Sequence, residues 1–456
     1  MFKSFRGGIH PKDNKDLSSE IPIEVAPIPA KVVIPLRQHI GAEAVPIVEK
    51  GDIVKKGQLV ATKQGFVSSN IHASICGEVV DICPYNNGTS GKCLSIIIES
   101  NGEDEWAEDT LVTRDYEKLD ASELKDIIQT LGVVGMGGAT FPTHVKLSPN
   151  KKVDTFILNG AECEPYLNAD NRVLIEYTDK VIKGTKIAMK ILGVTKGYIG
   201  IEDNKKEAIE KLKEELLRIE NEEKINAEED EKKHAEKVDI EIVPLPTKYP
   251  QGAEKMLIKA ITGREVPSGG LPADVSVVVQ NVGTIVAICE AVCSGKPVIE
   301  RVVTVSGGGV AQPKNLFLKI GTIFEDAISY CGGVKEEYKK VIMGGPMMGF
   351  AQYTLDIPVV KGTSGILLLT EKETNMEKQY PCIKCGRCVQ ACPIGLLPCT
   401  LATLSEKDAY LVAREEYSLL DCIECGSCAY SCPAKRKIVQ SIRYAKRQCQ
   451  AQGNKK

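Results

Sequence analysis

The stretches PCIKCGRCVQACPIG (residues 381–395) and DCIECGSCAYSCPAK (residues 421–435) repeat one spacing of cysteines. Each reads C-x2-C-x2-C-x3-C-P, and the cysteines are Cys382, Cys385, Cys388 and Cys392 in the first run and Cys422, Cys425, Cys428 and Cys432 in the second. Three cysteines at i, i+3 and i+6 on a looped backbone can bind three irons of a cubane cluster through their soft thiolates, so the fourth ligand must come from elsewhere. The repeat therefore predicts two 4Fe–4S clusters.

The last cysteine of each run provides that fourth ligand. In two-cluster ferredoxins the fourth cysteine of each run binds the other run's cluster. On that pattern, cluster 1 is held by Cys382, Cys385, Cys388 and Cys432, and cluster 2 by Cys422, Cys425, Cys428 and Cys392. Zinc ribbons and disulfides are the alternatives, but zinc usually takes two pairs of ligands and not four cysteines with a terminal proline. The 29 residues between Cys392 and Cys422 have apolar positions at helical intervals, which predicts a helical cluster domain.

Composition limits the possible classes of protein. The 456 residues, 43% of them hydrophobic, suffice for three or four domains with buried cores. A formal net charge of −3 with 5% aromatic residues gives no indication of nucleic-acid binding. The total of 17 cysteines is odd, and the nine outside the two runs show no paired framework. With no signal peptide, this cysteine usage predicts a reducing cytoplasm.

The most apolar window, VSVVVQNVGTIVAICEAVC (residues 275–293), is barely long enough to cross a bilayer and contains Gln280, Asn281 and Glu290. We interpret it as a buried strand followed by a helix. Any association with a membrane should therefore run through partner proteins.

The rest of the chain divides into three further segments. Residues 31–100, rich in β-branched residues and glycine turns, resemble the barrel-sandwich hybrid of biotinyl and lipoyl carrier domains. Phe66 stands where those carriers have their modified lysine, so a structural or docking role is predicted. Alternating helical and strand-like stretches follow, then short strands typical of a β-grasp unit. The expected domains are 1–115 (barrel-sandwich hybrid with an N-terminal extension), 116–295 (α/β domain), 296–365 (β-grasp, SLBB-type) and 366–456 (two-cluster ferredoxin-type domain).

The second informative stretch is GVVGMGGATFPTHVK (residues 132–146). The glycines at 135, 137 and 138 let the backbone approach a phosphate closely, with consecutive amides directed at the anion. A lone glycine-rich turn is weak evidence, because many such turns are purely structural. GGPMMG (residues 344–349) lacks a following lysine and helix, so it is interpreted as tight turns.

Four segments taken together are more specific than the glycines alone. GMGGATFPTHVK, NGAECEPYLNAD (159–170), YPQGAEKML (249–257) and QNVGTIVAI (280–288) resemble the flavin- and NADH-binding subunit of respiratory complex I. With the leading barrel, the opening GGIHPKDNK and the doubled cluster motif, the chain most resembles the C subunits of Rnf ion-translocating ferredoxin:NAD oxidoreductases. The resemblance covers nearly the whole chain.

The resemblance implies roles for individual residues. It assigns Gly135, Gly137, Gly138 and Lys146 to the surroundings of the FMN phosphate and isoalloxazine. It also implies polar flavin contacts from Asn159, Glu162, Asn281 and Thr284, packing of Phe141 against the nucleotide adenine, and a place for Glu164 near the dinucleotide. Three positions depart from the complex I pattern: Met136 replaces an arginine, Ala161 an aspartate and Gly283 a glutamate.

The implied function is electron transfer in a membrane-bound complex that couples ferredoxin and NAD+ to ion translocation. Non-covalent FMN would convert between hydride and single electrons, with NAD(H) as substrate and the two clusters as a wire. The implied partners include an iron–sulfur subunit that relays electrons from ferredoxin, and the implied location is peripheral, on the cytoplasmic side of the cell membrane. The alternatives are a corrin reductase of the propanediol-utilisation type, which begins near the flavin loop, and a flavin-free iron–sulfur carrier.

Overall fold

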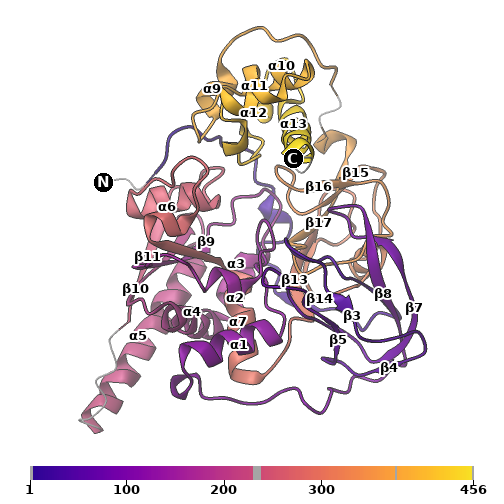
Figure 1. The fold of residues 1–456 in the computed structure, drawn as a ribbon, viewed down its shortest axis with the longest axis vertical. Helices are drawn as coiled ribbons and strands as arrows, with labels where there is room; N and C mark the ends of the chain where they lie inside the picture. The colour runs from indigo at the N-terminus through magenta and orange to yellow at the C-terminus, as the bar shows by residue number, and fades with distance from the viewer. Residues whose placement is uncertain (1–3, 230–237, 375–376, 454–456) are drawn as a thin grey trace.

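The computed structural model describes residues 4–229, 238–374 and 377–453. Four units occupy distinct parts of the molecule, and the helical cluster domain lies at one end of it (Figure 1). The multidomain α/β and α+β fold class predicted from the sequence is confirmed. Short 3-10 helices lie at Lys15–Leu17, Tyr116–Lys118, Pro272–Val275, Glu371–Glu373 and Leu419–Asp421.

The barrel-sandwich hybrid consists of two antiparallel sheets. One has the order β2-β8-β7-β4 and the other β3-β5-β6. Their bounds are β2 (Lys31–Pro35), β3 (Val45–Pro46), β4 (Ile53–Val54), β5 (Leu59–Thr62), β6 (Ile71–His72), β7 (Gly77–Asn86) and β8 (Lys92–Ser100). Val32, Ile34, Ile96 and Ile98 are fully buried between the sheets, as alternation along the strands requires.

This barrel packs on the flavin domain through the loop that a carrier would use for its cofactor. Phe66, 63% exposed in the β5–β6 loop, makes an edge-on ring contact with His144, and its carbonyl lies 3.1 Å from His144 Nε2. Nearby, the buried Lys361 Nζ donates to the carbonyls of Asn70 (2.8 Å) and Gly132 (2.7 Å). The barrel therefore contacts both the flavin domain and Lys361, and its structural or docking role stays a prediction.

The flavin domain has a four-stranded parallel sheet of order β11-β10-β9-β12. Phe156 and Leu158 of β9 face one core while Ile157 faces the other, so the sheet is covered on both sides. Helix α6 covers one face, and the five helices α1, α3, α4, α5 and α7 contribute to the other. The bounds are α1 (Ala121–Thr130), α2 (Thr143–Lys146), β9 (Thr155–Gly160), α3 (Ala169–Glu176), α4 (Thr178–Leu192), β10 (Lys196–Glu202), α5 (Lys206–Glu229), β11 (Asp239–Leu245), α6 (Glu254–Thr262), β12 (Val277–Asn281) and α7 (Val282–Ser294).

The strand order gives this sheet a topological switch point. The chain runs outward from β9 through β10 to β11 and then returns to β12 on the other side of β9. In open parallel sheets, ligands bind at the carboxyl ends of the strands where the order reverses. Asn159 of β9 and Asn281 of β12, which pair in register, mark that place, here called the switch-point edge. The apolar window at 275–293 is the strand β12 followed by α7, as predicted.

The β-grasp domain has a six-stranded sheet of order β1-β14-β13-β17-β15-β16. Its elements are β1 (Ile23–Val25), β13 (Glu300–Ser306), β14 (Lys314–Lys319), α8 (Phe324–Tyr330), β15 (Tyr338–Met343), β16 (Phe350–Gln352) and β17 (Gly365–Thr370). Strand β17 pairs with both β13 and β15, so the predicted division between residues 365 and 366 cuts through a central strand. We propose that the β-grasp domain ends after Thr370 and that the divisions after residues 115 and 295 are kept. Strand β1 lies within the predicted first domain, 1–115, but pairs with β14, so this part of the N-terminal extension completes the β-grasp sheet.

The cluster domain consists of short helices, as its periodicity predicted. They are α9 (Arg387–Ala391), α10 (Pro398–Glu406), α11 (Tyr410–Glu415), α12 (Ser427–Tyr430) and α13 (Ile438–Gly453). Leu401, Leu419, Ile442 and Ala445 form its buried centre. Among the helices in the described part of the chain, none is both long and apolar enough to cross a membrane.

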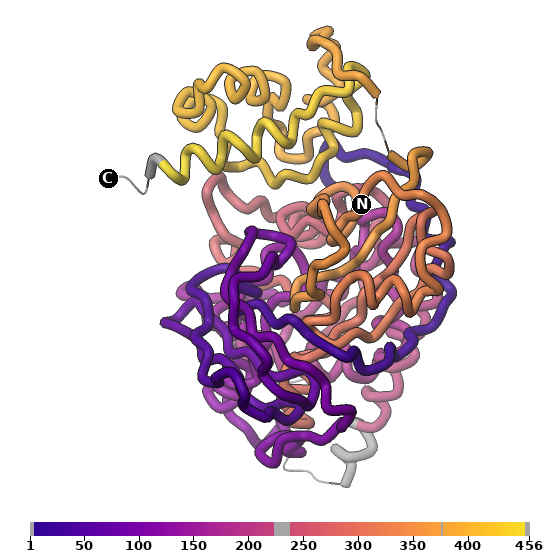
Figure 2. The backbone as a smooth tube through the Cα atoms, turned by 90° about the vertical axis from the view of Figure 1, so that its right-hand side faces the viewer, coloured from indigo at the N-terminus to yellow at the C-terminus, as the bar shows by residue number. Residues whose placement is uncertain are grey.

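The N-terminal extension runs between the cluster domain and the rest of the molecule (Figures 1 and 2). Gly8 donates its N–H to the carbonyl of Ala391, and Ile9 exchanges two backbone hydrogen bonds with Tyr249. A Cβ on Gly7 would lie 2.7 Å from the carbonyl oxygen of Cys392, so this backbone approaches the cluster motif as only glycine allows. The extension therefore joins three domains.

Candidate functional site

The glycine loop (residues 135–138) lies against the start of α7 at the switch-point edge. The Met136 N–H donates to Thr284 Oγ1 at 2.8 Å. Asn281 caps the helix, since its Oδ1 accepts the N–H groups of Gly283 (2.9 Å) and Thr284 (3.4 Å). A Cβ on Gly137 would lie 3.3 Å from the Asn281 side chain. The structure thus brings together the predicted loop, Asn281 and Thr284.

The outer side of the loop is the open one. Gly137 and Gly138 are exposed, and a Cβ on Gly138, whose φ is +61°, would meet no described atom within 4 Å. Gly135 is held from behind, because its N–H donates to the Phe141 carbonyl at 2.8 Å. Phe141 itself is half-buried at the point where the loop closes. A phosphate can approach the loop amides from this outer side.

A charged cluster, which sequence reasoning missed, lies beneath the loop. Asn281 Nδ2 donates to Asp170 Oδ2 at 2.6 Å, and buried Arg301 donates Nη1–H to the Met136 carbonyl at 3.3 Å. Burial, and next the charge of Glu162, raise the pKa of Asp170 to about 7, against the opposing effect of Arg301. The cavity here is about 40 Å³, far below the roughly 300 Å³ of an ordinary ligand pocket. This cluster supports the loop from below.

Arg301 also explains the departure at Met136. The complex I pattern has an arginine at that loop position, whereas here a guanidinium reaches the same loop from β13 of the β-grasp domain. The two residues are 165 positions apart, so local sequence carries no signal for the contact. The single arginine in an otherwise apolar strand, RVVTV (301–305), was the available hint.

The segment YPQGAEKML forms the other side of the switch-point edge. Asn159 Nδ2 donates to the Gly252 carbonyl at 2.8 Å, and Lys146 Nζ pairs with Glu254 Oε1 at 2.5 Å. The Lys146 side chain is 29% exposed. A Cβ on Gly252 would lie 2.1 Å from the Ala161 carbonyl oxygen, so glycine is required there. The two predicted residues Lys146 and Asn159 therefore contact the same segment.

Unpartnered polar atoms at this edge test whether a flavin fits. Both amide atoms of Gln251 and Nε2 of Gln280 are buried and have no hydrogen-bond partner among the described residues. Buried amides normally have partners, because an unmade hydrogen bond costs about 1–3 kcal/mol. Amides, backbone N–H groups and a lysine are the donors and acceptors that an isoalloxazine edge and a phosphate need. The residues present fit FMN.

Glu162 was predicted to make a polar contact with the flavin, and the structure places its carboxylate at the start of α3. Its carboxylate accepts the N–H groups of Asp170 (3.0 Å) and Asn171 (3.2 Å) at the first turn of α3. The residue is 9% exposed. It therefore serves as an anionic cap for α3 and reaches the switch-point edge through Asp170 and Asn281.

Glu164 lies away from the glycine loop, where three domains meet. Its carboxylate accepts the N–H groups of Met347 and Met348, both at 3.0 Å, and lies 3.2 Å from the Tyr249 hydroxyl. The turn GGPMMG thus binds a buried carboxylate, and a Cβ on Gly345 would clash with it at 2.1 Å. Burial raises the pKa of Glu164 to about 7.

Tyr249, also missed at the sequence level, connects that carboxylate to the second cysteine run. Its hydroxyl donates to the carbonyl of Cys425 at 2.7 Å. Ile9, Tyr249, Ala391 and Cys425 form one buried apolar cluster. The second cysteine run therefore packs directly on the flavin domain.

The cysteines of the two runs differ in exposure. Cys382 and Cys385 are exposed, Cys422 and Cys432 are intermediate, and Cys388, Cys392, Cys425 and Cys428 are buried. Burial raises the pKa of Cys425 and Cys428, and the neighbouring Cys392 thiol raises both further. Cys392 thus lies near Cys425 and Cys428, and the crossed ligand set of cluster 2 stays a prediction that this proximity supports.

No three Cys, His, Asp or Glu side chains in the described part of the chain are placed to bind one metal ion. A 4Fe–4S cluster needs a different arrangement, since each of its four thiolates binds a different iron. Burial, and then the Cys399 thiol, raise the pKa of Cys388 to about 11. Because iron binds the thiolate, iron binding would have to offset the cost of deprotonating this thiol.

Comparison with known proteins defines the class first. Family models match the chain as a Nuo51 FMN-binding domain (residues 128–290), an RnfC barrel sandwich hybrid domain (3–103), an SLBB domain (302–351) and a 4Fe-4S dicluster domain (381–436). The crystal structure of an NAD+-reducing [NiFe]-hydrogenase shares the fold, with a TM-score of 0.52 and 20% identity over 72% of this chain and 64% of that one. The chain is thus an FMN and iron–sulfur electron-transfer protein.

Two curated relatives narrow the class to one family. The C subunit of the proton-translocating ferredoxin:NAD(+) oxidoreductase complex of Clostridium ljungdahlii is 57% identical over 100% of this chain and 96% of the relative. The Na(+)-translocating counterpart of Acetobacterium woodii is 46% identical over 99% and 98%. The chain belongs to the family of C subunits of Rnf-type ion-translocating ferredoxin:NAD+ oxidoreductase complexes.

Proposed function

We propose that this chain is the NAD(H)- and FMN-binding electron-transfer subunit of an Rnf-type complex that couples ferredoxin and NAD+ to ion translocation. The observation that carries the proposal is the identity of 57% along the whole chain to a C subunit of that kind. When bound, FMN converts between the hydride of NADH and single electrons, which 4Fe–4S clusters can carry. The corrin reductase and the flavin-free carrier are not favoured, because the chain has both the FMN-binding and the RnfC domains.

The residues at the switch-point edge would hold FMN. The amides of Gly137 and Gly138, on the open side of the loop, would bind its phosphate. Lys146 adds a positive charge from the opposite segment, within reach of Glu254. Asn159 and the Asn281–Thr284 cap fix the backbone around the flavin ring edge.

The nicotinamide nucleotide binds over the same edge. Phe141 has its aromatic ring available to pack against adenine, whereas Gly135 belongs with the FMN loop. Glu164 acts on the dinucleotide side through the Tyr249 contact, and Glu162 acts on the flavin side through the α3 cap. Both glutamates therefore position other groups.

The two cysteine sets form a path from the flavin domain to the surface. Cys392, Cys425 and Cys428, with Cys422, are the ligands of cluster 2, which faces the flavin domain through Tyr249. Cys382, Cys385 and Cys388, with Cys432, are the ligands of cluster 1, whose first two cysteines are exposed. That exposure suits an exchange of electrons with another protein.

The partner at that surface is an iron–sulfur subunit which relays electrons from ferredoxin. Residues 377–456 carry thirteen Lys and Arg against seven Asp and Glu, although the whole chain has a formal charge of −3. The cluster domain is therefore the basic part of the protein and favours an acidic partner. The complex holds the chain peripherally at the cytoplasmic face of the membrane.

Anaerobic purification of the chain with reconstituted clusters tests the proposal. We expect about one FMN and eight irons per chain, and bleaching of the flavin absorbance on addition of NADH. A preparation with eight irons that releases no flavin on acid treatment would favour the iron–sulfur carrier. Flavin that NADH cannot bleach would exclude the NADH site.

A further inference from the structure

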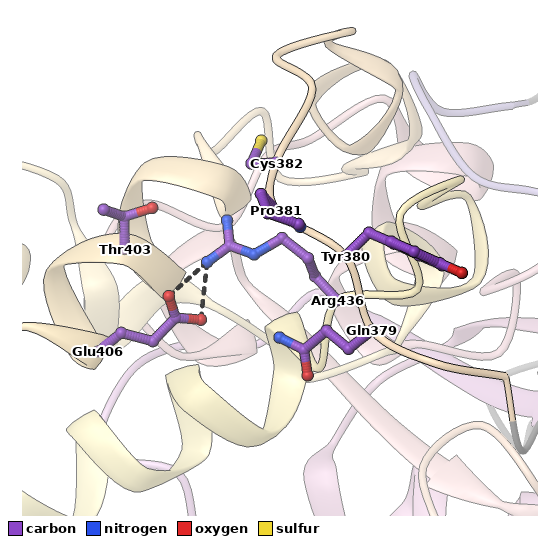
Figure 3. A pocket seen from close by; sticks show the side chains of 7 residues that line it. All are labelled: Gln379, Tyr380, Pro381, Cys382, Thr403, Glu406 and Arg436. Carbon is purple, nitrogen blue, oxygen red and sulfur yellow. Dashed lines mark hydrogen bonds and ion pairs between the residues drawn. The ribbon is translucent and has the colours of Figure 1, made fainter.

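An open cavity of about 450 Å³ lies beside the first cysteine of the first run. Cys382 forms part of its wall, together with Tyr380, Thr403, Glu406 and Arg436 (Figure 3). The cavity therefore lies between this predicted cluster ligand and Arg436, which follows the second cysteine run.

Arg436 is fixed at the wall of this cavity. It is only 7% exposed, and its Nη2 lies 2.7 and 2.6 Å from the two carboxylate oxygens of Glu406. The carboxylate is at the rim, 43% exposed. A guanidinium that contacts both oxygens of a carboxylate has little freedom to turn, so the direction of its remaining N–H groups is set.

The other terminal nitrogen of Arg436 lacks an acceptor. Nη1 is buried and has no hydrogen-bond partner among the residues that the structure describes. It lies on the side of the guanidinium that faces Pro381 and Cys382 (Figure 3). The Cys382 side chain shares this cavity wall with Arg436, so sulfur is an acceptor available on that side of the guanidinium.

The internal repeat supplies a comparison. Arg436 follows Cys432 by four residues, and the equivalent position after Cys392 is Leu396. Leu396 packs against the apolar core of the cluster domain. The tail of the second run thus carries a cation to the first run, whereas the tail of the first run carries an apolar side chain.

We propose that Arg436 is a positioning residue which donates its Nη1–H to a sulfur of cluster 1 and raises the reduction potential of that cluster. The proposal rests on the crossed ligand assignment in the proposed function. Reduction adds one electron and therefore negative charge, which a fixed cation and a hydrogen bond to sulfur both stabilise. The guanidinium stays protonated in both states, so no proton accompanies the electron.

Redox titration of the holoprotein, followed by electron paramagnetic resonance, tests this role. Arg436→Gln should move the potential of one cluster to more negative values and leave the other unchanged. Arg436→Lys keeps the positive charge but lacks the planar guanidinium. Its cluster potential should lie between those of Arg436→Gln and the wild type. Cys388→Ser identifies which signal belongs to cluster 1.

Glu406→Gln separates an electrostatic role from a structural one. It removes a negative charge beside the cluster while keeping an acceptor for Arg436, so the potential should move in the positive direction. Damage to the fold would instead move both variants the same way or reduce the iron content of both.

Three results would overturn the proposal: an unchanged potential in Arg436→Gln at full iron content, equal shifts of both clusters, or loss of cluster 1 in all three variants at Arg436 and Glu406. Absence of two clusters from the wild-type protein would overturn the proposed function instead. The two failures are therefore distinguishable.

Discussion

Replacing Tyr249 with phenylalanine tests how the cluster domain is held on the flavin domain. Tyr249 is 2% exposed, and its hydroxyl lies 2.7 Å from the Cys425 carbonyl oxygen and 3.2 Å from Glu164 Oε1. Phenylalanine keeps the ring that packs with Ile9 and Ala391. The substitution therefore removes the hydroxyl and little else.

The structure sets the size of the expected loss. The Cys425 carbonyl becomes a buried acceptor without this donor, which costs about 1–3 kcal/mol. The hydroxyl has one proton, which it donates to the Cys425 carbonyl, so the 3.2 Å contact with Glu164 is not counted as a second donated bond in the expected loss.

Urea unfolding under anaerobic conditions measures this loss through the iron–sulfur absorbance. The matched control is Tyr353→Phe, because Tyr353 is 83% exposed and its hydroxyl accepts a 3.3 Å contact from Asn86. The control should stay within about 0.5 kcal/mol of the wild type. The reasoning is wrong if Tyr249→Phe unfolds like the control.

Three other predictions test separate parts of the site. Gly137→Val places a branched side chain 3.3 Å from Asn281 and over the loop amides. FMN affinity should therefore fall by at least about tenfold, or 1.4 kcal/mol, at unchanged iron content. Normal flavin content in this variant would show that the FMN site lies elsewhere. Cys392→Ser should perturb the same paramagnetic signal as Cys428→Ser, and a match with Cys388→Ser instead would mean that each run holds its own cluster. Burial lowers the pKa of Lys361 to about 7 in the folded protein, whereas its ordinary pKa is 10.5. Between these two pH values the lysine is protonated in the unfolded state and largely neutral in the folded state, so folding stability rises with pH in that range. The unfolding free energy of the wild type relative to Lys361→Met should rise by up to about 2 kcal/mol from pH 7.5 to 9, whereas a flat difference would place the ammonium in a wetter site.

Local patterns accounted for much of the architecture. Alternation predicted the strand β9 from VDTFILNG, and helical periodicity predicted α4, α10 and α11. The cysteine repeat predicted a dicluster domain because ligand spacing is itself a local property. The end of the β-grasp domain could not be found in this way. Strand β17 (Gly365–Thr370) joins that sheet through pairing with strands far away in sequence.

Local motifs likewise predicted one part of the candidate site and missed another. Gly137, Asn281 and Thr284 were predicted from their motifs, and the structure brings them together. Arg301 and Tyr249 were not predicted, because their roles depend on contacts 165 and 176 positions along the chain. A single arginine or tyrosine has many structural uses, and only the assembled domains show which groups it meets.

The position of the N-terminal extension has a consequence for the order in which the protein is made. Residues 8 and 9 contact Ala391 and Tyr249, and β1 (Ile23–Val25) pairs in parallel with β14. Synthesis proceeds from the N-terminus at roughly 5–20 residues per second, so residue 9 is complete at least about 20 seconds before residue 391. The contacts with Tyr249 and β14 can form earlier, but the hydrogen bond from Gly8 to Ala391 must wait until the cluster domain has been made. Protection of this glycine segment from a protease would therefore report that the cluster domain has docked on the rest of the molecule.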